Sequence, residues 1–266
     1  MKELPAPLVP APLSVVIPVR NEACGLPPLL ADLAVAPQLV RQVLVVDGGS
    51  DDATALVARL GGALVLASPA GRGEQLRRGV HASEAPWLLL LHGDVRLPGG
   101  WPALLERAIG RGEGRAWAFR LAIEGNDPAL RLVERAVSLR SRWRGLPYGD
   151  QGLLISRALH DRLGGLKPLP LMEDLDFALR LRRLAWPGLL PAALRVSDRR
   201  WRRLGVWQTA LANARLRRDW RRGVAPAELA RRYHRAGRPP EAGPGYGAYQ
   251  KAQRRWAGSS SQPWAP

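Results

Sequence analysis

Cysteine, lysine and long apolar runs are scarce in this chain of 266 residues. The single cysteine, Cys24, excludes an internal disulfide, and no Cys/His cluster has the spacing of a zinc site. No apolar run approaches the roughly 20 residues that a membrane-spanning helix requires. Prolines interrupt the N-terminal segment, where Lys2 is offset by Glu3, so we expect no export signal. These absences predict a cytoplasmic protein with no transmembrane span.

Acidic residues are fewer than basic ones, 23 against 40, which gives a net charge of +17. Only three of the basic residues are lysine, and the excess is concentrated from Asp198 to Arg255, where 16 basic residues face four acidic ones. Because such an arginine bias is typical of a GC-rich genome, we rank a solvated surface ahead of nucleic-acid binding. Peripheral contact with anionic lipid headgroups and plain helix packing are further alternatives. Both depend on apolar residues interleaved with these arginines, namely Trp207, Leu211, Leu216 and Trp220.

Apolar runs alternate with helical patterns along the chain. The first part predicts strands at 13–19, 42–46, 63–67 and 87–91, with helices at 25–34, 51–60 and 73–82, the second of them capped by Ser50. The later part predicts helices at 101–109, 128–142, 157–163 and 173–184, and strands at 116–123, 152–155 and 192–196. Two helices at 204–222 and 227–234 follow. This alternation predicts a doubly wound α/β sheet.

The length allows one good-sized α/β core with a small appendage, so we expect a single catalytic domain. We divide the chain into an N-terminal extension at 1–12, a catalytic domain at 13–203, a C-terminal helical segment at 204–236 and a tail at 237–266. The tail is rich in Gly, Pro, Ser and Gln, and we expect it to lack stable structure.

Polar residues follow several predicted strands at the point where each strand ends. In an open α/β sheet, ligands bind beyond the carboxyl ends of the strands. The groups are Arg-Asn-Glu at 20–22, Asp-Gly-Gly-Ser-Asp at 47–51 and His-Gly-Asp at 92–94, joined by Met-Glu-Asp at 172–174. All four would present a carboxylate to the same edge.

Asp47 follows four apolar residues and precedes two glycines. There a carboxylate can accept hydrogen bonds from a base or a ribose hydroxyl while the backbone turns sharply. We interpret Asp47 as a nucleoside-binding residue. The alternative is a helix cap, a role that Ser50 or Asp51 would fill equally well.

Asp94 also stands at a strand end, where the charge of a diphosphate would need a divalent cation. A hard oxygen ligand suits Mg²⁺ or Mn²⁺, whereas the alternative is an aspartate that forms a turn after Gly93. His92 would face the same way if the chain stays extended. An isolated histidine, however, is more often a hydrogen-bonded structural residue.

Glu173 and Asp174 open an amphipathic helix. As acidic residues of a first turn they would stabilise that helix. They also follow a largely apolar, proline-bearing stretch, which favours the rim of a pocket, where a carboxylate can take the proton of an attacking hydroxyl. Arg72 stands between two glycines at another helix start. This motif lacks the third glycine of a dinucleotide loop and the Walker lysine, but an anion can bind there.

With these residues the sequence resembles a family 2 glycosyltransferase from about Leu13 to about Arg203. The segments SVVIPVRNEA at 14–23 and VLVVDGGSDDAT at 43–54 are similar to the opening strand and the nucleotide-binding loop of the family, and LLLLHGDVRLP at 88–98 to its metal motif. GDQGLLISR at 149–157 and PLMEDLDFALRLRR at 170–183 resemble its acceptor-side and general-base segments. Within the family, the resemblance is closest to the bacterial radical-SAM/selenodomain-associated transferases linked with arsenosugar biosynthesis.

The resemblance implies a GT-A fold, in which a Rossmann-like, mostly parallel sheet is flanked by helices, with further C-terminal helices. It implies that Asp174 is the general base, with Glu173 beside it. It implies a metal site at Asp94 and His92, because the usual D-x-D motif is His92-x-Asp94 here. The residues implied to bind the nucleotide sugar are Pro18, Asn21, Glu22, Asp47, Gly49, Asp51, Arg72, Gly93 and Asp94. Those implied on the acceptor or diphosphate side are Asp150, Gln151, Arg200 and Trp201.

The expected activity is an inverting transfer of one sugar from a nucleotide-diphosphate sugar, UDP by default, to a hydroxyl acceptor that is a small molecule or a lipid. Mn²⁺ or Mg²⁺ is the expected cofactor. Polymer synthesis is not expected, because the glutamine of the processive Q-x-x-R-W motif is absent. One alternative is a sugar-nucleotide nucleotidyltransferase, although the glycine- and Arg/Lys-rich loop expected after its first strand is missing. The other is a non-catalytic basic protein that binds nucleic acid or a membrane surface.

Overall fold

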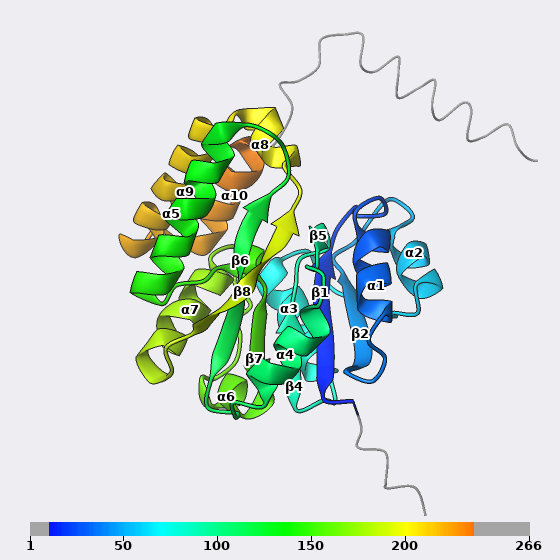
Figure 1. Ribbon diagram of the computed structural model, residues 1–266. Helices are drawn as coiled ribbons and strands as arrows, with labels where there is room; N and C mark the ends of the chain where they lie inside the picture. Colours follow the sequence, from blue (N-terminus) through cyan, green and yellow to red (C-terminus); the bar gives the residue numbers. More distant parts are fainter. Residues whose placement is uncertain (1–10, 237–266) are drawn as a thin grey trace, which may run out of the picture. The chain divides into compact units, whose positions relative to one another are not determined.

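The computed structural model describes residues 11–236 of the chain (Figure 1). The extension expected at 1–12 lies almost wholly outside the described residues, and so does the tail expected at 237–266. The chain divides into two compact units. The first ends at Ala230, and the second, which begins at Arg231, is described only to Ala236.

An eight-stranded sheet forms the centre of the first unit, with the strand order β3-β2-β1-β4-β7-β6-β8-β5 (Figure 1). Its strands are β1 (Leu13–Val19), β2 (Val40–Asp47), β3 (Leu64–Ala67), β4 (Trp87–Leu90), β5 (Val95–Arg96), β6 (Ala116–Ile123), β7 (Leu153–Ser156) and β8 (Gly188–Val196). The pairs β3-β2, β2-β1, β1-β4 and β6-β8 are parallel, and the remaining three are antiparallel. The predicted α/β fold with a mostly parallel sheet is confirmed.

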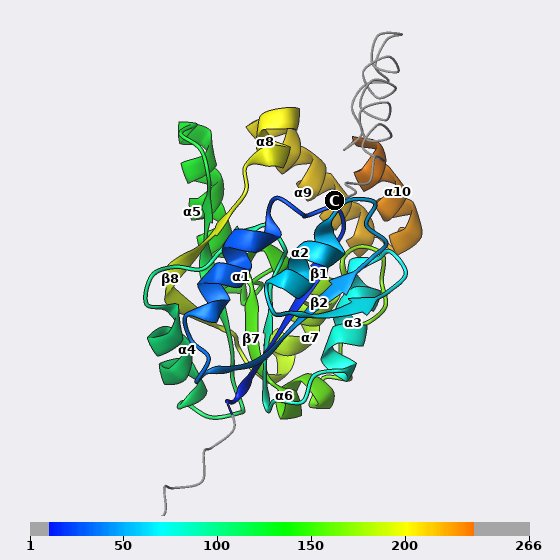
Figure 2. The same cartoon turned by 90° about the vertical axis from the view of Figure 1, so that its right-hand side faces the viewer.

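Helices flank this sheet, as Figure 2 shows from the side. The helices of the first unit are α1 (Leu26–Ala34), α2 (Thr54–Leu60), α3 (Arg72–His81), α4 (Trp101–Ile109), α5 (Pro128–Arg144), α6 (Arg157–Arg162), α7 (Glu173–Leu184), α8 (Arg199–Leu204) and α9 (Val206–Arg221), with a short 3₁₀ turn, η1 (Gly149–Gln151). A last helix, α10 (Pro226–Ala236), spans the boundary between the two units. Within the described residues, every helix is too short or too polar to cross a bilayer.

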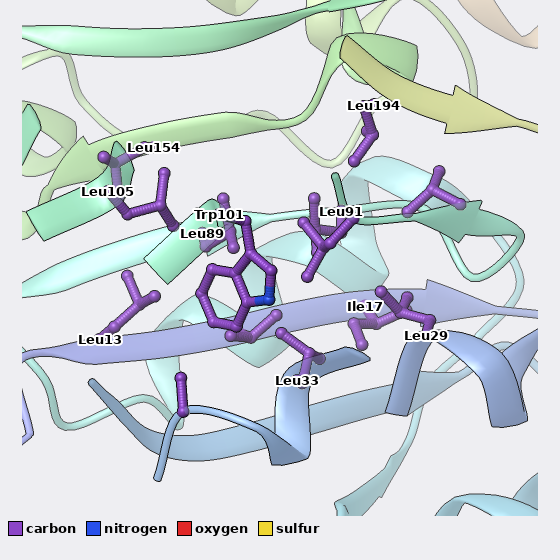
Figure 3. Packing of buried hydrophobic residues seen from close by; sticks show 14 of the residues in the cluster. Leu13, Ile17, Leu29, Leu33, Leu89, Leu91, Trp101, Leu105, Leu154 and Leu194 are labelled. Carbon is purple, nitrogen blue, oxygen red and sulfur yellow. The ribbon is translucent and has the colours of Figure 1, made fainter. Parts of the chain in front are cut away.

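Side chains of the central strands alternate between two apolar layers because successive residues of a strand point to opposite faces. Leu13, Val15 and Ile17 of β1 join α1, α2 and α4 in one layer, part of which Figure 3 shows. Val16 of the same strand joins α3, α6 and α7 in the other. A smaller cluster packs the end of β6 against α5 and α9.

Three elements were not predicted, namely β5, η1 and α8. The two-residue β5 exists because it pairs with β8, and no local sequence pattern reveals such a contact. The helix predicted at 204–222 is wrong at its start, because Gly205, with φ of 79°, separates α8 from α9. The Ser50 cap is also wrong: α2 begins only at Thr54, after Ala53, and no side chain caps it.

The central strand β4 generates a prediction about stability. Leu89 is completely buried there, so Leu89→Ala should lower the free energy of unfolding by about 2–5 kcal/mol, through lost burial and the cavity left behind. The matched control is Leu56→Ala on α2, where the leucine is 57% exposed and the change should stay within about 0.5 kcal/mol. Guanidinium denaturation measures both values, and equal losses would contradict this packing.

Candidate functional site

The carboxyl ends of β1 and β2 lie side by side and are tied together by one side chain. Val19 pairs with Asp47 in the parallel register of the two strands. Gln75 of α3 is buried, and its Nε2 donates hydrogen bonds to the carbonyl oxygens of Val19 and Val46, at 2.9 and 2.8 Å. Because both carbonyls are satisfied, this sheet edge is fixed before any ligand arrives. Sequence reasoning missed Gln75, since one glutamine in a helix carries no signal.

Hydrogen bonds connect the loops that follow β1 and β2. Asp47 Oδ1 accepts bonds from the backbone N and Oγ of Ser50, at 2.9 and 2.6 Å. Asn21 N donates to Ser50 Oγ at 2.9 Å, and Asn21 Oδ1 accepts from Asp51 N at 2.8 Å. Asn21 adopts a left-handed φ of 56°, which asparagine tolerates better than most residues. Hydrogen bonds therefore join the two loops to each other, and the carboxylate of Asp47 holds the loop that follows it in a fixed conformation.

Three further residues expected to bind the nucleotide sugar lie around these loops. Pro18 is half-buried in β1, opposite Val46 of β2. Gly49 adopts a φ of 82° in the turn after β2. Gly93 lies so close to β1 that an added Cβ would be 2.9 Å from Val19 Cγ1, so only glycine fits there.

Glu22 and Asp94 lie together and share one arginine. The Nη2 atom of Arg199 donates to both carboxylate oxygens of Glu22, at 2.9 and 2.7 Å, and to Asp94 Oδ2 at 3.3 Å. Partial burial raises the pKa of Glu22 above its ordinary value, and the bond from Arg199 opposes this rise. Two neighbouring carboxylates therefore share the positive charge of one guanidinium.

The pairing of β5 with β8 explains how Arg199 reaches this position. Val95 of β5 lies opposite Val196 of β8, so the residue before β5 comes near the residues after β8. Asp94 and Arg199 occupy those places. The two residues expected from the sequence on the acceptor or diphosphate side, Arg200 and Trp201, directly follow Arg199 in the chain. Arg200 is half-buried and has interactions of its own, and Trp201 packs against the cluster of α5, β6 and α9.

The carboxylate of Asp174 is held at the start of α7. Its Oδ2 accepts a hydrogen bond from Gly149 N at 2.9 Å, and its Oδ1 accepts one from Leu175 N at 2.7 Å. An added Cβ at Gly149 would lie 2.8 Å from His92 Nε2, so this approach requires glycine. Met172, just before the helix, has a left-handed φ of 67°, which is unusual for this residue type and often marks a functional site.

Glu173, the neighbour of Asp174, is completely buried. Its Oε1 lies 3.5 Å from Nη1 of Arg72, which stands at the start of α3. Burial raises the pKa of Glu173 to about 7, because a carboxylate is poorly solvated there, and Arg72 opposes the rise. The group therefore exchanges its proton near neutral pH.

His92 and Asp174 lie in the same part of the site. Both line one pocket, and burial, followed by the charge of Arg72, lowers the pKa of His92 to about 3, so the imidazole is neutral. Among residues 11–233 there is no group of three or more His, Cys, Asp or Glu side chains arranged to hold a metal. Of the two residues expected at the metal site, Asp94 accepts a hydrogen bond from Arg199, and His92 Nε2 lies 2.8 Å from the position that a Cβ of Gly149 would take.

The pocket that His92 lines has a volume of about 40 Å³ and opens to solvent. Its polar side chains are those of Arg72, His92, Tyr148, Glu173 and Asp174. The remaining lining residues are Leu76, Leu90, Leu91, Pro147, Gly149, Gly152, Leu153, Leu166, Phe177, Ala178 and Leu181. A small molecule with an apolar body and a few polar groups suits such a lining.

Asp150 and Gln151, expected on the acceptor side, lie in η1. The side chain of Gln151 is completely buried, and its Oε1 accepts bonds from Ser141 Oγ and Arg140 Nη2, at 2.7 and 3.0 Å. Its Nε2 donates to the carbonyl oxygen of Phe119 at 3.0 Å. Gln151 therefore fixes the loop that carries Gly149. Burial raises the pKa of Asp150 above its ordinary value, and the nearby Arg140 opposes this.

Comparison with known families gives one match. The family model described as "Glycosyl transferase family 2" matches residues 14–169, more than half of the chain. This span includes Glu22, Asp47 and Asp94 but ends before Glu173 and Asp174. No curated protein gives a significant match.

Solved structures also resemble this chain. Glucosyl-3-phosphoglycerate synthase from Mycobacterium tuberculosis, in complex with phosphoglyceric acid, has a TM-score of 0.52 and 22% identity, over 70% of this chain and 70% of that chain. The same enzyme with Mn²⁺, UDP and phosphoglyceric acid has a TM-score of 0.51 and 22% identity, over 70% and 68%. S. aureus TarS 1-349 has a TM-score of 0.56 and 16% identity, over 70% and 60%. At these identities the likeness establishes the fold alone.

The buried Glu173 generates a prediction about pH. Its pKa is about 7 in the folded chain and near its ordinary value of 4.5 in the unfolded chain. As the pH rises from 4.5 to 7, the unfolded state loses this proton first, so the contribution of Glu173 to stability falls by roughly 3 kcal/mol. Glu173→Gln keeps a neutral side chain and should remove this decline.

Denaturation of both proteins between pH 4.5 and 8 measures the effect. The free energy of unfolding of the original chain, minus that of Glu173→Gln, should decrease across this range. The exposed Glu84→Gln is the matched control and should give a nearly constant difference. Parallel curves for the original chain and Glu173→Gln would show that Glu173 ionises normally.

Proposed function

This chain belongs to glycosyl transferase family 2 and is a glycosyltransferase, and we propose that it transfers a single sugar from a nucleotide-diphosphate sugar to a hydroxyl acceptor. One observation carries the proposal. The Asp47 loop, the Glu22–Asp94 pair and Asp174 gather around the carboxyl ends of neighbouring strands, where ligands of open α/β sheets bind. Family membership decides against the nucleotidyltransferase and non-catalytic alternatives.

The donor end of the proposed site is the joined loop pair after β1 and β2. Asn21, Asp47 and Asp51 lie in one network there, and we assign them to the nucleoside. The similar synthase from M. tuberculosis has been solved with Mn²⁺ and UDP, which supports UDP as the first nucleotide to test.

Glu22 and Asp94 are the side chains that fit a divalent cation. They already lie around the positive charge of Arg199, which supports a cation site between them. Two carboxylates fall short of a complete coordination shell. That suits Mg²⁺ or Mn²⁺, since such ions usually keep water and bind substrate phosphates. When bound, the cation would offset the negative charge that develops on the departing diphosphate.

Asp174 is the proposed general base, and two backbone hydrogen bonds orient it. Gly149 N and Leu175 N hold its carboxylate in a fixed orientation, so it can accept the proton of an acceptor hydroxyl in the pocket. Attack by this oxygen on the side opposite the diphosphate inverts the anomeric carbon. Arg72, at the start of α3, is the side chain that we assign to electrostatic stabilisation of the leaving diphosphate.

Two features support transfer of one sugar rather than polymer synthesis. The glutamine of the processive motif is absent, and Trp201 packs into an apolar cluster on the far part of β6. The narrower relationship to radical-SAM-associated transferases depends on the motif resemblance alone. The acceptor that we propose is a small molecule or a lipid with a free hydroxyl.

If Asp94 binds the metal ion, its replacement should abolish the metal-dependent binding of the nucleotide. UDP with Mn²⁺ should stabilise the original chain by about 2–3 kcal/mol at roughly 100 times its Kd, and Asp94→Ala should abolish this gain. Thermal unfolding with and without the ligands measures it, at about 2–4 °C for each kcal/mol. Glu84→Ala, an exposed acidic residue, is the control that should keep the full shift. Equal shifts in all three proteins would refute the role of Asp94.

If Asp174 is the general base, its replacement should leave nucleotide binding intact and slow sugar transfer. Asp174→Asn should bind UDP and Mn²⁺ as well as the original chain, because the donor site is formed by other loops. Its rate of acceptor-dependent UDP release should fall by about 10²–10⁴-fold, the usual contribution of a general base. A panel of UDP-sugars and hydroxyl acceptors provides the assay, with the exposed Asp161→Asn as control. Retained turnover would place the base elsewhere.

A further inference from the structure

Helix α5 carries apolar side chains on the face opposite the core. Its inner face, with Leu130 and Val137, is buried. Its outer face carries a row that we call the α5 stripe, formed by Leu132, Ala136, Leu139 and Trp143. These positions follow one another at helical spacings of four, three and four residues, so they lie in one line along the helix.

The exposure of this row is unusual for a helix with one buried face. Leu132 is 51% exposed, Leu139 48% and Trp143 72%, whereas the outer face of a surface helix is normally polar. Trp186 lies beside the end of the helix. It is 55% exposed, and its ring lies 3.0 Å from the position that a Cβ of Gly145 would take. Two exposed tryptophans therefore lie near the C-terminal end of α5.

A row of arginines runs beside the stripe. Arg131, Arg135 and Arg142 precede Leu132, Ala136 and Trp143 by one residue each, so they lie along one side of the apolar row. Arg131 pairs with Glu134. Arg135 and Arg142 are exposed, and neither occurs in an ion pair among the described residues. Their positive charges remain available to an anionic partner.

We propose that the α5 stripe, with Arg135 and Arg142 beside it, docks onto an anionic lipid surface. Aliphatic side chains and tryptophan bury their apolar parts at the boundary of headgroups and acyl chains, and arginines pair with the headgroups. Each basic residue near such a surface adds to the attraction. The net charge of +17 strengthens this attraction. It opposes pairing with a second copy, because two basic rows would then face each other.

Side-chain exposure distinguishes α5 from the C-terminal residues that the sequence suggested for lipid contact. On α9, Trp207 and Leu211 are exposed. Leu216 is buried, however, and Trp220 is half-buried, so those four residues form no continuous exposed row. For Leu216 the helix-packing alternative is the right one. The proposal therefore concerns α5, and it holds whether or not the proposed sugar transfer is correct.

Co-sedimentation of the full chain with lipid vesicles tests the proposal. Vesicles contain either phosphatidylcholine alone or a mixture with phosphatidylglycerol, at low salt and again at about three times physiological ionic strength, where charge attraction is screened. The stripe variant is Leu139→Gln with Trp143→Gln. The control, Leu56→Gln with Leu60→Gln on α2, removes two leucines that are 57% and 79% exposed. A third variant replaces Arg135 and Arg142 with Gln.

The original chain and the α2 control should bind the phosphatidylglycerol vesicles equally. The stripe variant should bind at least about tenfold more weakly and lose most of the binding that survives high salt, since apolar burial drives that part. The arginine variant should weaken binding at low salt only. Unchanged melting temperatures will show that the variants fold, as expected for exposed positions.

Equal vesicle binding by the stripe variant and the α2 control would overturn the proposal. A monomer–dimer equilibrium in solution that only the stripe variant abolishes, with unchanged vesicle binding, would also overturn it and assign the stripe to a second copy. Neither measurement depends on turnover, so failure here leaves the sugar transfer untouched, and a failed sugar transfer leaves this result intact.

Discussion

Repulsion between carboxylates collected at one edge of the sheet is the constraint on which the site depends. Glu22 and Asp94 lie on one side of this edge, and Glu173 and Asp174 on the other. Burial raises the pKa of Glu22 and of Glu173, and the charges of Asp94 and Asp174 add to these rises, which nearby cations oppose. Each pair has its own arginine, Arg199 for the first and Arg72 for the second.

The two pairs differ in burial, and this difference separates their proposed roles. The carboxylates of Glu22 and Asp94 are partly exposed, and both are bound to the half-exposed side chain of Arg199. A metal ion with its diphosphate can therefore replace Arg199 as their positive partner. In the second pair, burial keeps the proton on Glu173 up to a pH near 7. Asp174, its neighbour, is held in place by two backbone N–H groups, which suits the proposed base.

Much of the fold could be predicted because the pattern of apolar residues is a local property. The strands at 13–19 and 116–123 and the helices at 101–109 and 173–184 have the predicted boundaries. The strand-end acidic groups were also found, since a carboxylate directly after a buried strand is visible in the sequence. Long-range pairing was not visible. Only the pairing of β5 with β8 shows that Arg199, and not the neighbouring Arg200, contacts Asp94. Likewise, only the folded structure shows that Gln75 and Gln151 hold the backbone around the site through hydrogen bonds.

An anomalous difference map from crystals grown with UDP and Mn²⁺ would test whether Glu22 and Asp94 form the cation site of a nucleotide-sugar enzyme. We expect a manganese peak within coordination distance of the Asp94 carboxylate, with the diphosphate of UDP beside it and Arg199 no longer bound to that carboxylate. A manganese peak at another surface, with Arg199 still joined to Glu22 and Asp94, would contradict it.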